Sequence, residues 1–264
     1  MPAEAFRGRI VTTSVFAKPR YGLKLGDCQF YHTMEIPGVG LVTAPDAKWD
    51  LRPHVSDFLR TDLSNKRVIE IGPASGFLTF EMERLGGTVT IVDAPEDHEW
   101  DIVPFPGLRE VWGPGSRLGW KAITNGWWFA HEHFRSKARA AYVGGNGARP
   151  EALGRYDIGV LSNILLHNRD PLRILTNCAD LADTVIIVEP FQQDLEDFNQ
   201  PLVRFDPIPT PRAGEENWNV WWRFSTLYFK NFLTVMGFKH FNVHRFTVPW
   251  GVVPIPHFTM VASR

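Results

Sequence analysis

The sequence has few cysteines and no long apolar segment. Its only cysteines, Cys28 and Cys178, form neither a CxxC pair nor a disulfide framework, which fits a reducing compartment. No stretch of about 18 apolar residues occurs, and residues 1–20 contain no unbroken apolar core of a secretory signal. These absences predict a cytoplasmic protein that does not insert into a membrane.

The chain also lacks an excess of charge of either sign. Lys and Arg number 28 against 29 Asp and Glu, for a net charge of −1, so no global positive field attracts a nucleic-acid backbone. A local basic run is better explained as a solvated face than as a phosphate contact; it comprises Arg135, Lys137, Arg139, Arg149 and Arg155. Hydrophobic residues make up 44% of the chain, which excludes a disordered protein.

Aromatic residues, in contrast, are abundant and unevenly placed. The chain has ten Trp and nineteen Phe, and most of the Trp residues fall in two stretches, residues 112–128 and 218–222. Aromatic side chains fill cores and also line ligand pockets. We predict that part of this set contacts a small, partly aromatic or apolar substrate, with core packing as the alternative: Trp112, Trp127, Trp128, Trp221 and Trp222. Trp120 and Trp218 belong to the same two stretches and are also expected to roof the cofactor site.

Short apolar runs alternate with helix-like segments after residue 50. The predicted strands are 67–72, 88–93, 139–143, 156–162, 184–189, 239–246 and 257–264. The predicted helices are 51–60, 76–87, 125–135, a segment from about Asp170, and 225–237. This alternation predicts an α/β fold: a doubly wound, mainly parallel, seven-stranded Rossmann-like sheet with helices on both faces.

The most informative segment is Glu70-Ile71-Gly72-Pro73-Ala74-Ser75-Gly76, between a predicted strand and a predicted helix. Small residues here let a ligand approach backbone N–H groups at a helix N-terminus. Leu78 and Thr79 do not complete a dinucleotide fingerprint, and the Gly-Lys-Ser/Thr of a phosphate loop is absent. The alternative is that Gly72 and Gly76 only permit tight packing.

Acidic residues stand at the ends of the two strands flanking this segment. Glu70 can accept hydrogen bonds from an amino group, and Asp93 can accept hydrogen bonds from both hydroxyl groups of a ribose. An amino acid joined to a nucleoside indicates S-adenosylmethionine as the cofactor. The competing hypotheses are a nicotinamide-dependent oxidoreductase and an inactive scaffold that only binds the cofactor.

The segment resembles motif I of class I methyltransferases, acid-x-Gly-x-Gly-x-Gly, with Ala74 at the middle glycine. Residues 31–53, 67–87 and 156–175 together resemble the family that includes the tRNA wobble-uridine carboxymethyl transferase and uncharacterised relatives. The resemblance implies that Lys48 reaches the cofactor. A tyrosine that the tRNA enzyme uses near the extra carboxylate of its modified cofactor is Leu166 here, so ordinary S-adenosylmethionine is expected.

The same resemblance extends the predicted cofactor site. It implies that Ser162 and Asn163 border the methionine moiety and that Gly145 and Asn146 border adenine. The full predicted set is Lys48, Glu70, Gly72, Pro73, Ala74, Gly76, Asp93, Gly145, Asn146, Ser162 and Asn163. We expect residues 1–50 to cover this site, and residues 51–264 to form the methyltransferase domain with pocket-forming insertions at about 94–124 and 190–217.

Methyl transfer depends on positioning and, for O–H or N–H acceptors, on a base. His167 follows a predicted strand and His32 lies in the first family-like block, so both are candidate catalytic residues, with a structural role as the alternative. Glu189 either anchors substrate or caps the next segment.

His131 and His133 point apart on a helix, so no metal is expected. The predicted function is methylation of O or N on a small metabolite, with tRNA modification as the alternative.

Overall fold

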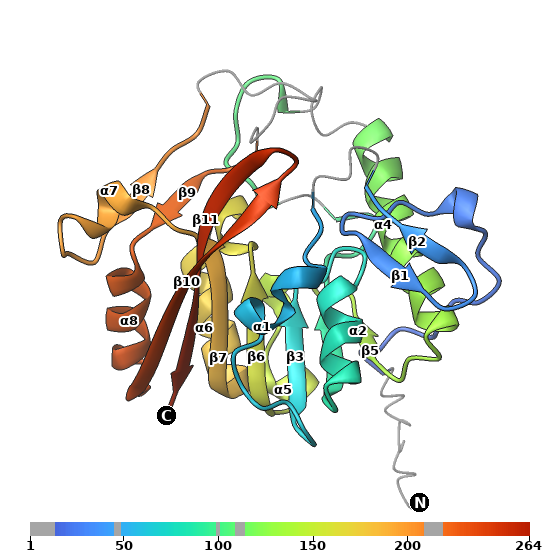
Figure 1. Cartoon of the computed structure of the whole chain (residues 1–264), viewed down its shortest axis with the longest axis horizontal. Coiled ribbons are helices and arrows are strands. Elements are labelled where there is room, and N and C mark those ends of the chain that lie inside the picture. The colour runs from blue at the N-terminus through green and yellow to red at the C-terminus, as the bar shows by residue number, and fades with distance from the viewer. Residues whose placement is uncertain (1–13, 45–48, 99–100, 109–113, 209–218) are drawn as a thin grey trace, which may run out of the picture.

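The computed structural model describes residues 14–44, 49–98, 101–108, 114–208 and 219–264. A seven-stranded sheet of order β10-β11-β7-β6-β3-β4-β5 forms its centre (Figure 1). β3 to β7 run parallel, and β11 is antiparallel to both β7 and β10. The strands are β3 Arg67–Ile71, β4 Thr88–Val92, β5 Arg139–Ala141, β6 Tyr156–Ser162, β7 Ala182–Pro190, β10 His240–Trp250 and β11 Val253–Ser263. The predicted mainly parallel sheet is confirmed.

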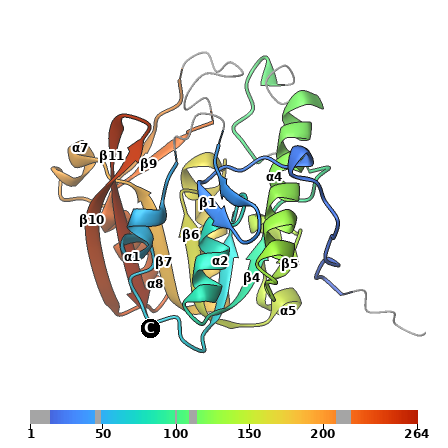
Figure 2. The ribbon, with the colours of Figure 1, turned by 45° about the vertical axis from the view of Figure 1, so that its right-hand side comes forward.

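Helices cover both faces of this sheet, as predicted. Along β3, Val68 packs in one hydrophobic core and Ile69 in the other, because successive side chains of a strand point to opposite faces. The first core includes residues of α1 Val55–Phe58, α2 Phe77–Arg84 and α4 Pro114–His133. The second includes residues of α5 Pro150–Leu153, α6 Pro171–Leu181 and α8 Thr226–Val235. Figure 2 shows α2 in front of the sheet, beside β4.

Helix α4 is longer than the sequence predicts. The expected helix covered residues 125–135, whereas α4 begins at Pro114. Gly115 and Gly119 lower helix propensity in this stretch, but tertiary contacts compensate. The Gln29 backbone N–H donates to the Ala122 carbonyl at 2.8 Å, and Asn125 Nδ2 donates to the Asp27 carbonyl at 3.1 Å. The segment before β1 thereby docks on α4 beside the short 3₁₀ helix η1 Leu25–Asp27.

Smaller elements surround the sheet. β1 Met34–Ile36 pairs with β2 Gly40–Val42, and β8 Val203–Phe205 pairs with β9 Trp222–Phe224. The remaining elements are η2 Arg52–His54, η3 Gly145–Gly147, η4 Leu165–His167 and α7 Gln193–Glu196. The region between the last two predicted strands is not a separate loop, because β10 and β11 continue pairing to Trp250 and Val253. Pro249 is tolerated there because β10 is the edge strand.

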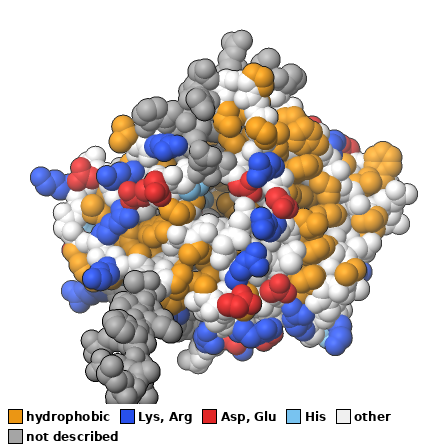
Figure 3. Space-filling view, turned by 180° about the vertical axis from the view of Figure 1, so that it is seen from behind, with side chains coloured by type: hydrophobic (Ala, Val, Ile, Leu, Met, Phe, Trp, Pro, Cys, Tyr) orange, Lys and Arg blue, Asp and Glu red, His pale blue; other side chains and the backbone are white. Residues whose placement is uncertain are grey.

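The surface carries mixed charge. On the face opposite the view of Figure 1, Lys and Arg side chains alternate with Asp and Glu, and apolar side chains lie between them (Figure 3). Among the described residues, no helix has the length and apolar character needed to cross a bilayer.

Candidate functional site

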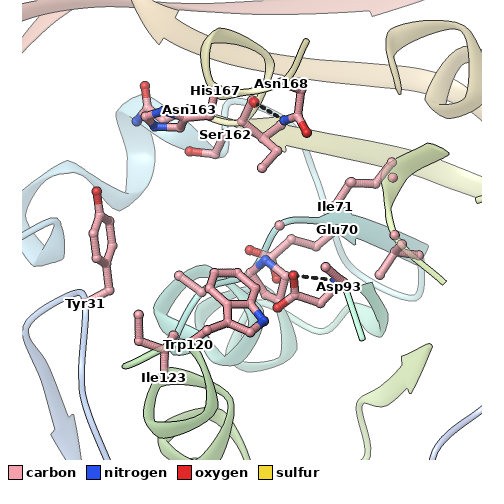
Figure 4. A pocket seen from close by; sticks show the side chains of 18 of the residues that line it. Tyr31, Glu70, Ile71, Asp93, Trp120, Ile123, Ser162, Asn163, His167 and Asn168 are labelled. Carbon is pink, nitrogen blue, oxygen red and sulfur yellow. Dashed lines mark hydrogen bonds between the residues drawn. The ribbon is translucent and has the colours of Figure 1, made fainter. Parts of the chain in front are cut away.

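A cavity of about 670 Å³ opens at the carboxyl ends of β3, β4 and β6 (Figure 4). The strand order reverses between β3 and β6, because β4 and β5 lie on one side of β3 whereas β6 and β7 lie on the other; open α/β sheets bind ligands at such switch points. The volume lies within the usual range for small-molecule sites. Of the predicted residues, the structure brings together His32, Glu70, Gly72, Pro73, Ala74, Asp93, Gly145, Asn146, Ser162, Asn163 and His167.

The turn after β3 is built around a glycine whose replacement by a larger residue would strain the backbone and displace the Ile164 side chain. Gly72 has a φ of 78°, and a Cβ on it would lie 2.7 Å from Ile164 Cδ1. Ala74 also has a positive φ, 50°. The Gly72 N–H donates to the Val92 carbonyl at 2.9 Å, which ties the turn to β4. The compact turn leaves the cavity open beside Pro73 and Ala74.

Two buried carboxyl groups face this cavity. Burial raises the pKa of Glu70 to about 7; a hydrogen bond from the Thr79 hydroxyl opposes the shift, and the nearby Asp93 carboxylate adds to it. Burial likewise raises the pKa of Asp93 to about 7, against a hydrogen bond from the Ala94 N–H at 2.8 Å. A ligand that supplies an ammonium group to Glu70 and hydroxyl donors to Asp93 would stabilise both ionised forms.

A third polar group lies at the end of the cavity near β5. Asn177 Nδ2 donates to the Gly145 and Asn146 carbonyl oxygens at 2.9 and 3.1 Å, which fixes η3. Asn146 Nδ2 donates to Asp101 Oδ2 at 2.7 Å, and Asp101 pairs with Arg169 at 3.0 Å. Asn146 Oδ1 is buried and has no partner among the described residues. It can therefore accept a hydrogen bond from a ligand amino group.

The end of β6 supplies a further polar pair. Ser162 and Asn163 line the cavity on the side opposite Glu70 and Asp93 (Figure 4). Asn163 has a φ of 50°, and its N–H donates to the Val188 carbonyl at 2.8 Å, so the side chain is held at the strand end. Its Oδ1 is buried without a partner within the described ranges.

Both candidate catalytic histidines also reach the cavity. Burial lowers the pKa of His32 to about 4, so its ring is neutral at pH 7. The ring packs edge-on against Tyr31, with centroids 4.9 Å apart. Burial also lowers the pKa of His167, whose Nδ1 lies 2.9 Å from the Asn219 carbonyl oxygen. Two neutral imidazoles therefore line the same cavity as the predicted methionine-binding residues.

Solved structures of similar fold exist, although no protein-family model and no curated protein matches this chain. The N-terminal domain of EvdMO1, solved with S-adenosylhomocysteine (SAH) and D-fucose, gives a TM-score of 0.52 at 16% identity over 89% of this chain and 91% of that one. A proposed methyltransferase from Bacillus halodurans C-125 gives a TM-score of 0.50 at 8% identity, over 80% of this chain and 98% of that one. The 1,6-didemethyltoxoflavin-N1-methyltransferase of Burkholderia thailandensis gives a TM-score of 0.49 at 16% identity, over 81% of this chain and 77% of that one.

The likenesses with TM-scores of 0.52 and 0.50 show which fold this sheet belongs to. This chain has the Rossmann-like fold of the class I methyltransferases. In this methyltransferase fold the first 50 residues contribute Gln29, Tyr31, His32 and Trp49 to the cavity, and the first insertion contributes residues from Ala94 to Ile123. No described residue of the second insertion, 190–217, lines the cavity.

The methyltransferase fold places several predicted residues elsewhere. Gly76, with a φ of 94°, does not line the cavity; a Cβ on it would lie 2.6 Å from both Phe80 and Trp127. The packing alternative therefore describes Gly76. Lys48, Trp112 and Trp218 lie outside the described residues. The remaining described tryptophans of the predicted set do not line the cavity either: Trp127, Trp128, Trp221 and Trp222.

These tryptophans serve the core and the support of the site, which corrects the expectation of substrate contact. Trp127, Trp128 and Trp221 are each 1% exposed. The Trp127 indole N–H donates to Thr79 Oγ1 at 3.3 Å, and Thr79 in turn donates to Glu70. Trp120, from the tryptophan-rich stretch 112–128, does line the cavity. Two further aromatic walls, Tyr31 and Trp49, were not assigned to it from the sequence, although both lie within the family-like block 31–53.

Glu189 also differs from its predicted role. It is 1% exposed, lies outside the cavity lining, and accepts a hydrogen bond from the Leu165 N–H at 3.0 Å. The carboxyl group at the end of β7 thus holds η4, which lies before β7 in the chain; it neither lines the cavity nor caps the segment that follows β7, as the two predicted roles required. Among the described residues, no cluster of three or more His, Cys, Asp or Glu could hold a metal ion.

We expect Glu189→Gln to reduce the loss of stability toward alkaline pH. Burial raises the pKa of Glu189 from 4.5 to about 8. The stabilisation that the protonated carboxyl group gives the folded state is therefore fully present below the pKa of the unfolded chain and is lost as pH rises to about 8. Gln cannot ionise but still accepts the Leu165 hydrogen bond. Urea unfolding at pH 5 and pH 8 should show a smaller decrease in the free energy of unfolding for the variant than for the wild type. The exposed Glu151→Gln is the control, and equal decreases in all three proteins would contradict the prediction.

Proposed function

We propose that this chain is an S-adenosylmethionine-dependent methyltransferase that acts on O or N of a small, partly aromatic or apolar acceptor. The observation that carries the proposal is the meeting of three recognition groups at one cavity. Glu70 suits the amino group of the cofactor, Asp93 its ribose hydroxyls, and Asn146 Oδ1 the amino group of adenine. These groups lie at the ends of β3 and β4 and in η3, as expected for one extended ligand.

The remaining cofactor contacts follow from this placement. Gly72, Pro73 and Ala74 would lie under the amino-acid part, and Ser162 and Asn163 would border the methionine moiety. Lys48 stays a prediction. When bound, the cofactor supplies a methyl group on a positively charged sulfur, and the chain needs mainly to position the acceptor in line with it. SAH is bound in the EvdMO1 structure, whose fold this chain shares.

The acceptor proposal is supported by the rest of the cavity wall. Tyr31, Trp49, Leu51, Trp120 and Ile123 give this part a largely apolar and aromatic surface. Figure 4 shows Tyr31 facing the cavity between the strand ends and α4. The balance of 28 basic and 29 acidic residues favours a small acceptor over tRNA, and the face seen in Figure 3 carries mixed charge; tRNA modification stays an alternative hypothesis. The two free cysteines fit the expected reducing compartment.

Calorimetric titration with SAH and, separately, with NAD⁺ and NADH tests the proposal. We expect saturable binding of SAH with one site per chain and no binding of either nicotinamide dinucleotide. Binding of NAD⁺ or NADH without binding of SAH would instead identify an oxidoreductase-type site. A methyltransferase must also turn over, so an acceptor that yields SAH from S-adenosylmethionine separates an enzyme from an inactive scaffold.

A further inference from the structure

The turn that carries His167 is held from two neighbouring segments. The Trp221 N–H donates to the Leu166 carbonyl at 2.9 Å, and the Trp222 indole N–H donates to the Asn168 carbonyl at 2.8 Å. From the sheet, Glu189 accepts the Leu165 N–H. Hydrogen bonds to Leu165 and Leu166 in η4, and to Asn168 directly after it, fix the backbone on both sides of His167. The ring is therefore held in one place at the cavity wall.

The remaining contact of His167 fixes which ring nitrogen carries the hydrogen. Its Nδ1 lies 2.9 Å from the Asn219 backbone carbonyl oxygen, and a carbonyl oxygen can only accept. Nδ1 must therefore be the donor. In the neutral imidazole the lone pair then lies on Nε2. A backbone carbonyl thus orients this histidine as a carboxylate orients the base in hydrolytic triads.

His32 has the opposite arrangement. Its Nδ1 is buried, and no hydrogen-bond partner among the described residues reaches it. A hydrogen on Nδ1 would be left without any acceptor, and buried N–H groups without an acceptor are rarer in proteins than acceptors without a donor, so we assign the hydrogen to Nε2. His32 can donate to a ligand through Nε2, whereas His167 can accept through Nε2. The two cavity histidines therefore differ in role.

Resting on the proposed function, we propose that His167 Nε2 is the catalytic base and that the acceptor is a neutral molecule whose reacting atom carries a hydrogen, an O–H or N–H. In the transfer, the acceptor oxygen or nitrogen forms a bond to the methyl carbon. The bond from that carbon to sulfur breaks, and its electron pair stays on sulfur. The acceptor's proton moves to His167 Nε2, and the imidazolium later releases it to water. The charge on sulfur is lost as the histidine becomes charged, so the net charge of the site is unchanged.

This assignment can be tested without knowing the acceptor. Sinefungin is a cofactor analogue in which a carbon bearing an amino group replaces the methylated sulfur, so it places an ammonium donor where the methyl group would leave. SAH has no donor at that position. A lone pair on His167 Nε2 should therefore favour sinefungin over SAH by roughly ten- to a hundredfold, the range of a hydrogen bond to a charged group.

The ratio of the two dissociation constants is then compared between variants. His167→Phe keeps an aromatic ring but has no lone pair, and we expect it to lower the preference for sinefungin by about tenfold while SAH affinity is kept. His32→Phe is the matched control and should leave the ratio unchanged. An unchanged ratio in His167→Phe with SAH binding intact overturns the proposal, as does a loss confined to His32→Phe. Absence of SAH binding to the wild type would instead reject the proposed function.

A measurement on the wild type covers the case in which His167→Phe does not fold. In ¹⁵N-histidine-labelled protein bound to SAH, the nitrogen spectrum distinguishes the two neutral tautomers, and His167→Gln assigns the signals. We expect His167 to carry its hydrogen on Nδ1 and His32 on Nε2 at pH 7. A hydrogen on His167 Nε2, or a doubly protonated ring, overturns the assignment of the base.

Discussion

Replacing Asp93 by alanine is expected to weaken binding of S-adenosylmethionine and of SAH by about ten- to a hundredfold, or about 1.5–3 kcal/mol. The carboxyl group lies at the end of β4 and is 8% exposed, and the Ala94 N–H holds one of its oxygens. Ribose hydroxyls would donate to the ionised group in a site with little water. Alanine removes the acceptor and leaves those hydroxyls without a protein partner. Calorimetry with SAH measures the change directly.

The same binding should depend on pH. Burial raises the pKa of Asp93 to about 7, and hydroxyl donors favour its ionised form. SAH affinity of the wild type should therefore fall as pH decreases below about 7, and Asp93→Ala should reduce this dependence. Asp97→Ala is the matched control, because Asp97 is exposed on the same segment and lies outside the cavity lining. Wild-type affinity in a folded Asp93→Ala protein would refute the ribose contact.

The sheet was predictable because its central strands are buried on both faces. β3 and β4 each present four consecutive buried residues, and such strands appear in sequence as short apolar runs. The helix-capping signals were also local: the Asp170 side chain accepts a hydrogen bond from the Arg173 N–H, and the Ser225 side chain accepts one from the Tyr228 N–H. The start of α4 was not predictable, because contacts from the distant segment 25–29 stabilise a glycine-containing stretch.

The candidate site was predictable where neighbours in sequence form it. Gly72 and Ala74 belong to one turn, and Glu70 and Asp93 mark the ends of adjacent strands. The tryptophans were misplaced because an aromatic residue in a core and one in a pocket look alike in sequence; only packing separates Trp127 from Trp120. Likewise, the contact between Asn219 and His167 joins residues 52 positions apart and leaves no pattern in the sequence.

The second large effect is expected at Gly76, where alanine should destabilise the fold by about 2–5 kcal/mol. Gly76 is the N-cap residue directly before α2, with φ 94° and ψ 12°, a left-handed conformation that costs other residues roughly 1–2 kcal/mol. In addition, the new Cβ would lie 2.6 Å from Phe80 Cε2 and from Trp127 Cδ1, and overpacking in a core costs about 1–3 kcal/mol. Urea unfolding followed by circular dichroism measures the loss. It is a large share of the roughly 5–15 kcal/mol that stabilises a typical domain.

Gly38→Ala separates the cost of the left-handed backbone from the cost of overpacking the core. Gly38 has a similar positive φ, 73°, but no described atom lies within 4 Å of the position of its Cβ. It should therefore show the backbone cost alone, and the difference between the two variants measures the packing of Trp127 against the start of α2. Because Trp127 donates to Thr79, which donates to Glu70, the displaced ring should also weaken SAH binding in Gly76→Ala and not in Gly38→Ala. Equal destabilisation by both substitutions would show that Trp127 does not pack on Gly76, and would remove the support that this ring gives to Glu70.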